Sequence, residues 1–378
     1  MAIALSDDQI RTLRLRAQRL APQQPGVPTS VAHVVKEVCG IQAQDANAAA
    51  LALRVRSAGL VAADVERARV QERTIIRSWG MRGTLHLLAT EDLGWLLPLL
   101  GPVFIAGDQR RREELGLDED TCIRGIRILR DILTNQGPLT RDELVEQLAL
   151  HGIRLAGQAR PHFLSRAALE GIICLGPLHG TESTYVLLND WIDQELKGQP
   201  LSEIAAYAEL TRCYLKAFGP ATPKDQAAWS GLSISKIRAA WQHIADQFIE
   251  VEVVGSPAWM LKIRAALLDE PLSHFPIIRL LPYFDTYLLG YQNRNLCVSP
   301  LYAKRINAGG GMVHPTVLVD GRIVGIWKSK REKNQLTVNV EPFEPLMTEV
   351  LAGIETEVAD IARFLEVPAL LHMTHHTP

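Results

Sequence analysis

The stretch Cys122–Leu150, CIRGIRILRDILTNQGPLTRDELVEQLAL, decides the fold that the sequence predicts. Its apolar residues recur at helical spacing on both sides of the break Gly137–Thr140, which predicts two helices joined by a short connection. Glu143 follows Thr140 at the spacing of a capping box, an arrangement that satisfies the first backbone N–H groups of a helix. We therefore expect a helix-turn-helix unit here.

The residues that follow extend this unit. The run RPHFLSRAALEG (160–171) predicts a third helix, and IICLG (172–176) and TYVLL (184–188) predict two strands joined by a turn. Three helices followed by a two-stranded hairpin form a winged helix, the helix-turn-helix variant that carries a β wing.

The same order of elements recurs further along the chain. Three helices and a hairpin are predicted for SEIAAYAELTRCYLKAFG (202–219), TPKDQAAWSG (222–231), SISKIRAAWQHIA (233–245), FIEVEVV (248–254) and AWML (258–261). The break Gly219–Thr222 also repeats the Gly-Pro-x-Thr pattern of the first copy. A repeated supersecondary unit is a stronger signal than either copy alone, so we expect tandem winged helices.

The remaining segments set the expected domain organisation. Helices and a short extended stretch dominate the first third, Thr90 is expected to cap a helix, and β-type segments follow Arg279, with Asp320-Gly321 as a hairpin turn signal. The fold class expected is mainly α with β wings (α+β). The expected domains are an N-terminal winged-helix-like domain (1–120), a second winged helix (121–198), a third (199–270) and a β-rich segment with a final helix (271–378). The end LLHMTHHTP (370–378) is expected to be a tail that binds no metal.

Composition limits the function classes. The formal net charge is −2, so no overall basic field indicates nucleic acid, and any DNA surface must come from local clusters. Five widely spaced cysteines without a CxxC motif predict a reduced, cytoplasmic protein. The acidic start and the lack of a long apolar run predict neither a signal peptide nor a membrane span. Winged helices usually bind DNA, although many mediate protein contacts.

Four segments resemble one known family. They are IQAQDANAAALALRVR (41–56), RSWGMRGTLHLLATEDLGWLL (77–97), LLPYFDTYLLGYQNR (280–294) and PTVLVDGRIVGIWK (315–328). In this order they are similar to the winged-helix alkyl-DNA glycosylases, AlkZ and its relatives, over essentially the whole chain. The resemblance implies a monomer in which three tandem winged helices form a C-shaped surface for double-stranded DNA. It also implies cleavage of the bond between an N7-alkylated guanine and its sugar, with unhooking of interstrand crosslinks in some members. The family signature, Gln-x-Gln or Gln-x-Asp, falls on Gln42, Ala43 and Gln44.

The two glutamines offer hydrogen bonds but no proton transfer. A Gln side chain does not ionise; it has one carbonyl acceptor and two N–H donors. Glycosidic cleavage passes through a transition state with positive charge on the sugar, so amides can hold the attacking water and direct dipoles toward that charge. This suffices where the leaving group is already good, and a cationic N7-alkylpurine leaves as a neutral base. We therefore expect Gln42 and Gln44 to be catalytic, with no cofactor. No Lys is placed beside them in the connection, so nothing points to a Schiff-base step.

The local pattern is consistent with such a site. Gly40 is predicted to end one helix and Asp45 or Asn47 to start the next, which leaves Ile41–Gln44 in the connection. Side chains two residues apart point the same way on an extended segment. The alternative is that both amides satisfy backbone groups at the helix ends. Asp45 is favoured as a helix cap; if it faces the site instead, it is the nearby carboxylate that could deprotonate the water.

Other polar residues are candidates for DNA contacts. Arg77 and Arg82 could bind phosphates or be solvated and paired. Lys304, Arg305 and His314 flank a triple glycine, a pattern that suits a backbone contact or a wedge in the minor groove. The densest basic run carries Lys328, Lys330 and Arg331, and it is either a phosphate contact or an exposed hairpin tip.

Three further features have a structural interpretation. Asp285 matches a family motif but could anchor a turn, His86 is expected to pack within a strand, and Arg110–Arg112 are expected on a solvated helix face. Two other function classes remain open for the whole chain: a non-enzymatic winged-helix DNA-binding protein such as a transcriptional regulator, and a protein-interaction scaffold.

Overall fold

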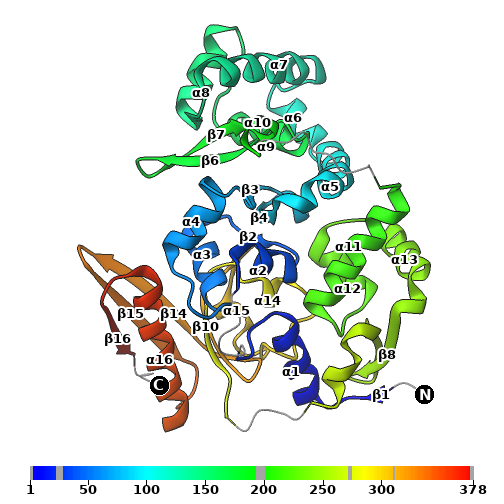
Figure 1. Ribbon diagram of the computed structural model, residues 1–378, viewed down its shortest axis with the longest axis vertical. Helices are drawn as coiled ribbons and strands as arrows, with labels where there is room; N and C mark the ends of the chain where they lie inside the picture. The colour runs from blue at the N-terminus through cyan, green and yellow to red at the C-terminus, as the bar shows by residue number, and fades with distance from the viewer. Residues whose placement is uncertain (1–2, 23–28, 193–200, 271–274, 310, 375–378) are drawn as a thin grey trace. The chain divides into compact units, whose positions relative to one another are not determined.

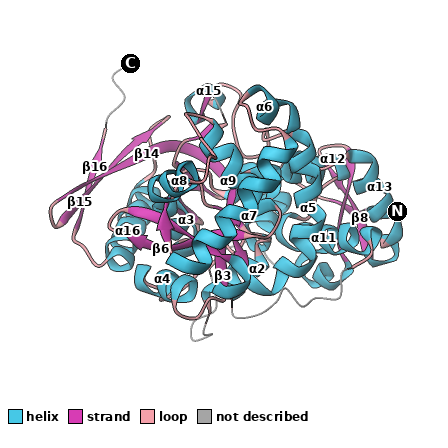
Figure 2. Cartoon of the chain, turned by 90° about the horizontal axis from the view of Figure 1, so that it is seen from above, coloured by secondary structure: helices cyan, strands magenta, loops and turns pink. Residues whose placement is uncertain are grey.

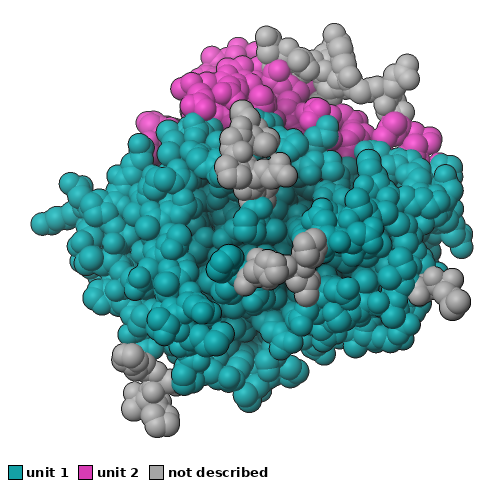
Figure 3. Space-filling view, turned by 60° about the horizontal axis from the view of Figure 1, so that its bottom comes forward, with its two compact units in different colours: residues 1–66, 208–378 teal, residues 67–207 magenta. Residues whose placement is uncertain are grey.

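A computed structural model of the chain describes residues 3–22, 29–192, 201–270, 275–309 and 311–374. The chain divides into two compact units (Figure 3), which are residues 1–66 with 208–378, here unit 1, and residues 67–207, here unit 2. Residues 67–120 therefore group with 121–207, whereas the sequence placed them in an N-terminal domain; the division into 1–120, 121–198, 199–270 and 271–378 stays a prediction. The protein is a mixed α+β protein, as expected.

Unit 2 contains the first predicted helix–helix–helix–hairpin unit (Figure 1). Its elements are α7 (Glu119–Gln136), β5 (Leu139–Thr140), α8 (Arg141–Leu150), α9 (Ala159–Leu169), β6 (Ile173–His179) and β7 (Glu182–Leu187). The capping box is present: the backbone N–H of Thr140 donates to Glu143 over 2.8 Å, and the Thr140 hydroxyl accepts from the backbone N–H of Glu143. The helices enclose a core around the fully buried Leu129, Leu144 and Phe163.

The remaining elements of unit 2 precede this helix–helix–helix–hairpin segment in the chain. It comprises β3 (Ile75–Trp79), β4 (Leu85–Ala89), α5 (Leu93–Gly107) and α6 (Gln109–Glu114), and α4 (Ala62–Val70) crosses the boundary at its start. In the sheet of this unit the strands follow the order β4-β3-β6-β7-β5. Thr90 does not cap α5, as the sequence suggested; residues 90–92 form a 3-10 turn, and the Thr90 hydroxyl donates to the carbonyl oxygen of Arg73 over 2.6 Å.

Unit 1 combines the N-terminal helices with the second copy of the repeat. Its elements are β1 (Ile3–Ala4), α1 (Asp7–Ala17), α2 (Val31–Glu37), β2 (Ile41–Gln42), α3 (Ala46–Arg54), α11 (Glu203–Phe218), α12 (Pro223–Ser230), α13 (Ile234–His243), β8 (Phe248–Val253) and β9 (Ser256–Leu261), with α11 starting just before the boundary. Capping boxes at Ser6 and Thr222 start α1 and α12. The predicted order of three helices and a hairpin is therefore confirmed here too.

The C-terminal part of unit 1 is a five-stranded sheet covered by one long helix (Figure 2). The strands β10 (Ile278–Leu281), β13 (Thr316–Val319), β14 (Arg322–Glu332), β15 (Gln335–Pro342) and β16 (Ala369–Met373) lie in that order, and α16 (Thr348–Leu365) packs on the sheet. The predicted turn joins β13 to β14, with φ of 47° at Asp320 and 79° at Gly321. A side chain at Gly321 would place its Cβ 2.8 Å from Arg11 Cβ, so glycine is required there.

The C-terminal residues correct one expectation. Residues 370–373, expected to belong to a tail, lie in β16 (Ala369–Met373), which pairs in parallel with β15. Residues 375–378 lie outside the described residues. In the described part of the chain, no helix has the length and hydropathy needed to cross a membrane, and no cluster of three or more His, Cys, Asp or Glu side chains could hold a metal ion.

Candidate functional site

The QAQ segment lies in a tight connection between two helices. Cys39 (φ 57°) and Gly40 (φ 88°) both adopt left-handed backbone conformations, and they turn the chain out of α2. The chain then runs through the two-residue strand β2 and enters α3 at Ala46. The expectation that the glutamines occupy a short, partly extended connection is therefore confirmed.

The three side chains of the segment differ in exposure. Ala43 is fully buried and Gln42 is 8% exposed, whereas Gln44 is exposed. Ala43 thus anchors the connection in the core, because a buried methyl group is costly to return to water. Gln42 offers an amide in a site that largely excludes solvent, and Gln44 offers one at the surface.

Asp45 caps helix α3. Its carboxylate accepts a hydrogen bond of 2.8 Å from the backbone N–H of Ala48, and its own backbone is extended (φ −110°, ψ 124°). The sequence favoured this role as a helix cap. An N-cap carboxylate satisfies a backbone N–H group and interacts favourably with the helix dipole. The side chain is exposed, so its second oxygen remains accessible.

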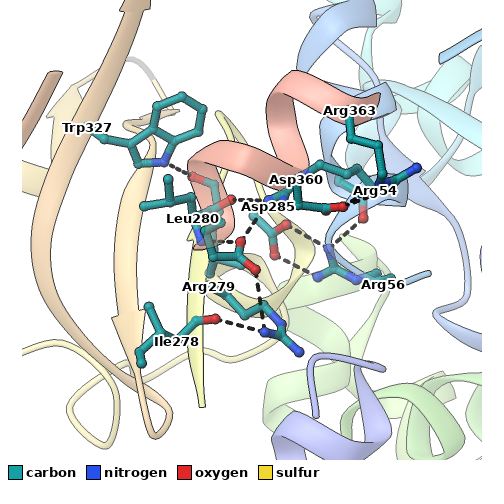
Figure 4. A network of polar contacts seen from close by, with 12 residues as sticks. Arg54, Arg56, Ile278, Arg279, Leu280, Asp285, Trp327, Asp360 and Arg363 are labelled. Atoms are coloured by element: carbon teal, nitrogen blue, oxygen red, sulfur yellow. Dashed lines mark hydrogen bonds and ion pairs between the residues drawn. The ribbon is translucent and has the colours of Figure 1, made fainter. Parts of the chain in front are cut away.

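A buried ionic network holds the other end of α3 (Figure 4). Arg54, fully buried, donates to Glu357 and Asp360 of α16 over 2.9 Å each and to the carbonyl oxygen of Leu280 in β10 over 3.2 Å. Two residues on, Arg56 forms a two-pronged ion pair with Asp285, with both N–O distances at 2.7 Å and both side chains inaccessible to solvent. Helix α3 is therefore fixed to the C-terminal sheet and to α16.

The network also settles the role of Asp285 in the fold. Besides Arg56, its carboxylate accepts from the backbone N–H of Tyr287 over 2.9 Å and so starts the short helix α14 (Thr286–Leu289). Arg56 also donates to the hydroxyl of Thr286, to the amide oxygen of Gln18 and to the carbonyl oxygen of Ala52. Asp285 therefore anchors a turn, which is one of the two roles that the sequence suggested for it. The arginines that meet these acids were not recognised, because nothing local in the sequence marks partners more than two hundred residues away.

The basic candidates near the triple glycine belong to unit 1. Lys304 and Arg305 lie on α15 (Ala303–Ile306), which leads into the hairpin of β11 (Asn307–Gly309) and β12 (Met312–Val313). Lys304 is exposed, whereas Arg305 pairs with Glu341 and lies 4.5 Å above the ring of Phe343.

His314 follows the same hairpin and is half-buried. Its ring centroid is 5.9 Å from that of Tyr283, and its Nδ1 atom is buried with no hydrogen-bond partner among the described residues. The basic run on β14 is exposed: Lys328, Lys330 and Arg331 are all accessible to solvent, and Lys330 pairs with Glu332 over 2.5 Å.

Arg77 and Arg82 belong to unit 2. Arg77 lies on β3 and donates to the Ser183 hydroxyl on β7 over 3.2 Å. Arg82 lies in the turn between β3 and β4 and has a left-handed backbone (φ 55°), a conformation uncommon outside glycine. On α6, Arg110 and Arg111 pair with Glu114 in solvent, as expected, whereas Arg112 is 2% exposed and donates to the carbonyl oxygen of Ile105, so the expectation of a solvated position was wrong for Arg112.

His86 is packed within β4, as expected, and is 2% exposed. Its Nδ1 atom lies 2.9 Å from the carbonyl oxygen of Thr84. Burial, reinforced by the charge of Arg82, lowers the pKa of His86 from 6.5 to about 3, so the ring is neutral at ordinary pH.

Comparison with known proteins identifies the family to which the chain belongs. The family model described as DNA glycosylase AlkZ-like matches residues 35–364, and the chain belongs to this family of DNA glycosylases. It is 29% identical over 377 residues to the interstrand DNA cross-link repair glycosylase of Streptomyces sahachiroi, covering 94% of this chain and 95% of that protein. The solved structure of Streptomyces sahachiroi DNA glycosylase AlkZ superposes with a TM-score of 0.83 at 27% identity, covering 98% of this chain and all of that one.

Proposed function

We propose that the protein is a monofunctional, cofactor-free DNA glycosylase that hydrolyses the N-glycosidic bond of cationic N7-alkylated purines in duplex DNA. The observation that carries this proposal is the placement of Gln42 and Gln44 in the tight connection before α3, within a chain that belongs to the AlkZ-like family. The name of the Streptomyces sahachiroi relative extends the proposal to interstrand crosslinks.

The proposed chemistry needs only positioned amides. One glutamine carbonyl accepts a hydrogen bond from the attacking water, and both amide dipoles stabilise the positive charge that develops on the sugar. The departing purine already carries a positive charge, so it leaves as a neutral base without a general acid. Gln42 is nearly buried, and a dipole acts more strongly in a site that excludes water. Asp45 is an auxiliary candidate whose accessible oxygen could take the proton of the water.

The DNA surface is proposed to follow the family arrangement, with tandem winged helices forming a C-shaped surface in a monomeric, cytoplasmic protein. Backbone contacts are proposed for Arg77, Arg82, Lys304, Arg305, His314, Lys328, Lys330 and Arg331. The exposed side chains on α15 and β14 are best suited to phosphates, because such contacts require solvent-accessible cations.

The deciding experiment is single-turnover release of 7-methylguanine from a methylated duplex by the wild-type protein, Gln42→Ala and Gln44→Ala. The wild type is expected to release the base. Each variant is expected to lose about a hundredfold or more in rate, the range found on removing one donor that stabilises a transition state, while DNA affinity and melting temperature stay unchanged.

The same assay covers the other outcomes. A crosslinked duplex serves as a second substrate, and release from neither duplex by the wild type would contradict the proposed activity. Unchanged release by both variants would assign the glutamines to the helix junction instead.

A further inference from the structure

The turn that leads into the QAQ segment contains two local features that oppose its own stability. Glu37 is the last residue of α2, where a negative charge meets the negative end of the helix dipole. Two residues on, Cys39 has a left-handed backbone (φ 57°) at the position where glycine is usual. The backbone N–H groups of residues 39 and 40 donate to carbonyl oxygens of α2 over 3.1 and 2.9 Å, which closes the turn as a Schellman motif. A conformation that its own residues do not favour persists only where the surrounding structure enforces it.

Glu37 makes the contacts that hold this turn in place. Its carboxylate pairs with Lys216 in the last turn of α11, and its second oxygen lies 3.5 Å from the guanidinium of Arg264. Arg264 belongs to the 3-10 turn Lys262–Leu268, which follows β9. The Glu37 side chain is 16% exposed, so solvent screens these ion pairs less than it screens a surface pair. The end of α2 is therefore fixed against the second copy of the helix–helix–helix–hairpin unit.

The carboxyl group of Glu37 is charged at neutral pH. Burial acts to raise its pKa, but the hydrogen bond and charge of Lys216, with the charge of Arg264, outweigh burial and hold the pKa below its usual value. Arg19 belongs to the same cluster, because its charge interacts with that of Glu37 and its Nε–H donates to the carbonyl oxygen of Arg56 over 3.3 Å. Residues before β2 and after α3 thus meet in one ionic cluster.

We propose that Glu37, held by Lys216 and Arg264, is a positioning residue that sets the direction in which the QAQ connection leaves α2. Four residues separate Glu37 from Gln42, so a rotation of the last turn of α2 displaces the Gln42 amide. Glu37 takes no part in the chemistry and acts through the backbone. The inference rests on the proposed catalytic role of the glutamines, and its test includes a measurement that does not depend on base release.

The experiment compares the full-length wild type with Glu37→Gln, with Lys216→Gln and with the double variant. The matched control is Glu114→Gln, because Glu114 is also the last residue of a helix and also pairs with two cations, but lies in unit 2. Hydrogen–deuterium exchange of the peptide that spans residues 38–45 reports the order of the connection. Single-turnover release of 7-methylguanine at saturating protein, duplex affinity and melting temperature are measured for each variant.

Glu37→Gln is expected to raise the exchange of residues 38–45 and to slow base release about ten- to a hundredfold, the loss that a small misplacement of a reacting group produces. Duplex affinity and melting temperature are expected to stay unchanged, because glutamine also removes an unfavourable charge from the end of α2. The double variant is expected to be no slower than Glu37→Gln, since both substitutions remove the same contact. Glu114→Gln is expected to match the wild type in every measurement.

Unchanged exchange of residues 38–45 in Glu37→Gln would overturn the inference, and so would faster exchange accompanied by the wild-type rate. Faster exchange spread through α2 and α11, with a lower melting temperature, would assign Glu37 to stability alone and would also overturn it. A wild type that releases no base would contradict the proposed function. The exchange measurement then decides the inference by itself, and faster exchange confined to residues 38–45 is the result in its favour.

Discussion

At the scale of single residues, the most informative feature is that the proposed catalytic pair does not titrate. Gln42 and Gln44 keep the same charge at every accessible pH. In the proposed mechanism the candidate for proton transfer is Asp45, whose carboxylate also caps the N-terminus of α3 through Ala48. Asp45 thus has two candidate roles that a pair of substitutions can separate.

We predict that Asp45→Asn retains base release and that Asp45→Ala loses stability. Asparagine caps a helix about as well as aspartate but carries no charge, whereas alanine removes the cap, at a cost of about 1 kcal/mol. Single-turnover rates and urea unfolding of both variants provide the measurement. A rate that falls equally in Asp45→Asn and Asp45→Ala, with the asparagine variant as stable as the wild type, would assign the carboxylate to water activation.

His86 leads to a second prediction, which concerns pH. Its pKa is lowered to about 3 in the folded protein by burial, from 6.5. Between these values the unfolded chain binds a proton at His86 that the folded protein does not. The contribution of His86 to the free energy of unfolding is therefore fully present above pH 6.5 and is lost as pH falls toward 3. At pH 5 the loss from this residue alone is about 2 kcal/mol.

The measurement is the free energy of unfolding in urea at pH 7 and pH 5 for the wild type and His86→Gln. The substitution lowers stability at pH 7, but the difference between the two pH values is expected to be smaller in the variant. An identical pH dependence in both proteins would show that His86 is not the residue responsible.

At the scale of secondary-structure elements, helix α3 is the element on which the site depends. The QAQ connection precedes its first turn, and the buried ion pairs of Arg54 and Arg56 fix its last turn to β10, α14 and α16. Ion pairs without solvent access tolerate the loss of one partner poorly, because the other charge remains buried and uncompensated.

We predict that Asp285→Ala costs about 3–5 kcal/mol of stability. The control is Glu114→Ala, which removes the exposed partner of Arg110 and Arg111 and is expected to cost less than about 1 kcal/mol. Urea unfolding monitored by circular dichroism compares the two. Similar losses in both variants would mean that the buried pair contributes no more than a surface contact.

At the scale of the whole molecule, the net charge of −2 makes the location of the cations decisive. A protein without an overall positive field relies on local clusters to bind phosphates. The exposed side chains of Lys328, Lys330 and Arg331 form the densest such cluster on β14.

Replacing these three residues by glutamine is therefore predicted to weaken duplex binding for every sequence tested. The slope of log affinity against log salt concentration should become shallower by about 0.9 for each phosphate that the protein no longer neutralises. Fluorescence anisotropy across a salt series measures the slope. The control replaces the exposed Arg110 and Arg111, whose partner is Glu114. An unchanged slope in the β14 variant would remove this hairpin from the DNA surface.

Much of the fold could be predicted because its signals are local. Helix starts at Ser6, Thr140 and Thr222 carry their own capping residues, and the turn at Asp320-Gly321 carries the residue types that a positive φ requires. The connection that carries the glutamines could be predicted equally well, because Gly40 and Asp45 mark its two ends in the sequence. Such patterns are set by neighbours within a few positions.

What could not be predicted depends on contacts between distant segments. Residues 370–373 belong to the segment expected to be a tail, but β15 provides an edge on which residues 369–373 pair as β16. The grouping of residues 67–120 with 121–207 depends on packing, and so do the partners of Arg54 and Arg56. The cations that hold Glu37 come from segments far along the chain, so no local pattern marks them either.

The anchoring of α3 has a consequence for how the protein is made. Arg54 emerges early from the ribosome, but its partners Glu357 and Asp360 are 303 and 306 positions further along the chain. Domains fold as the chain is synthesised, starting from its N-terminus. The segment that carries the glutamines therefore waits, with its arginines still hydrated, until α16 has been translated. A chain that stops before α16 has the two glutamines without the frame that orients them, so the proposed base release requires synthesis through α16.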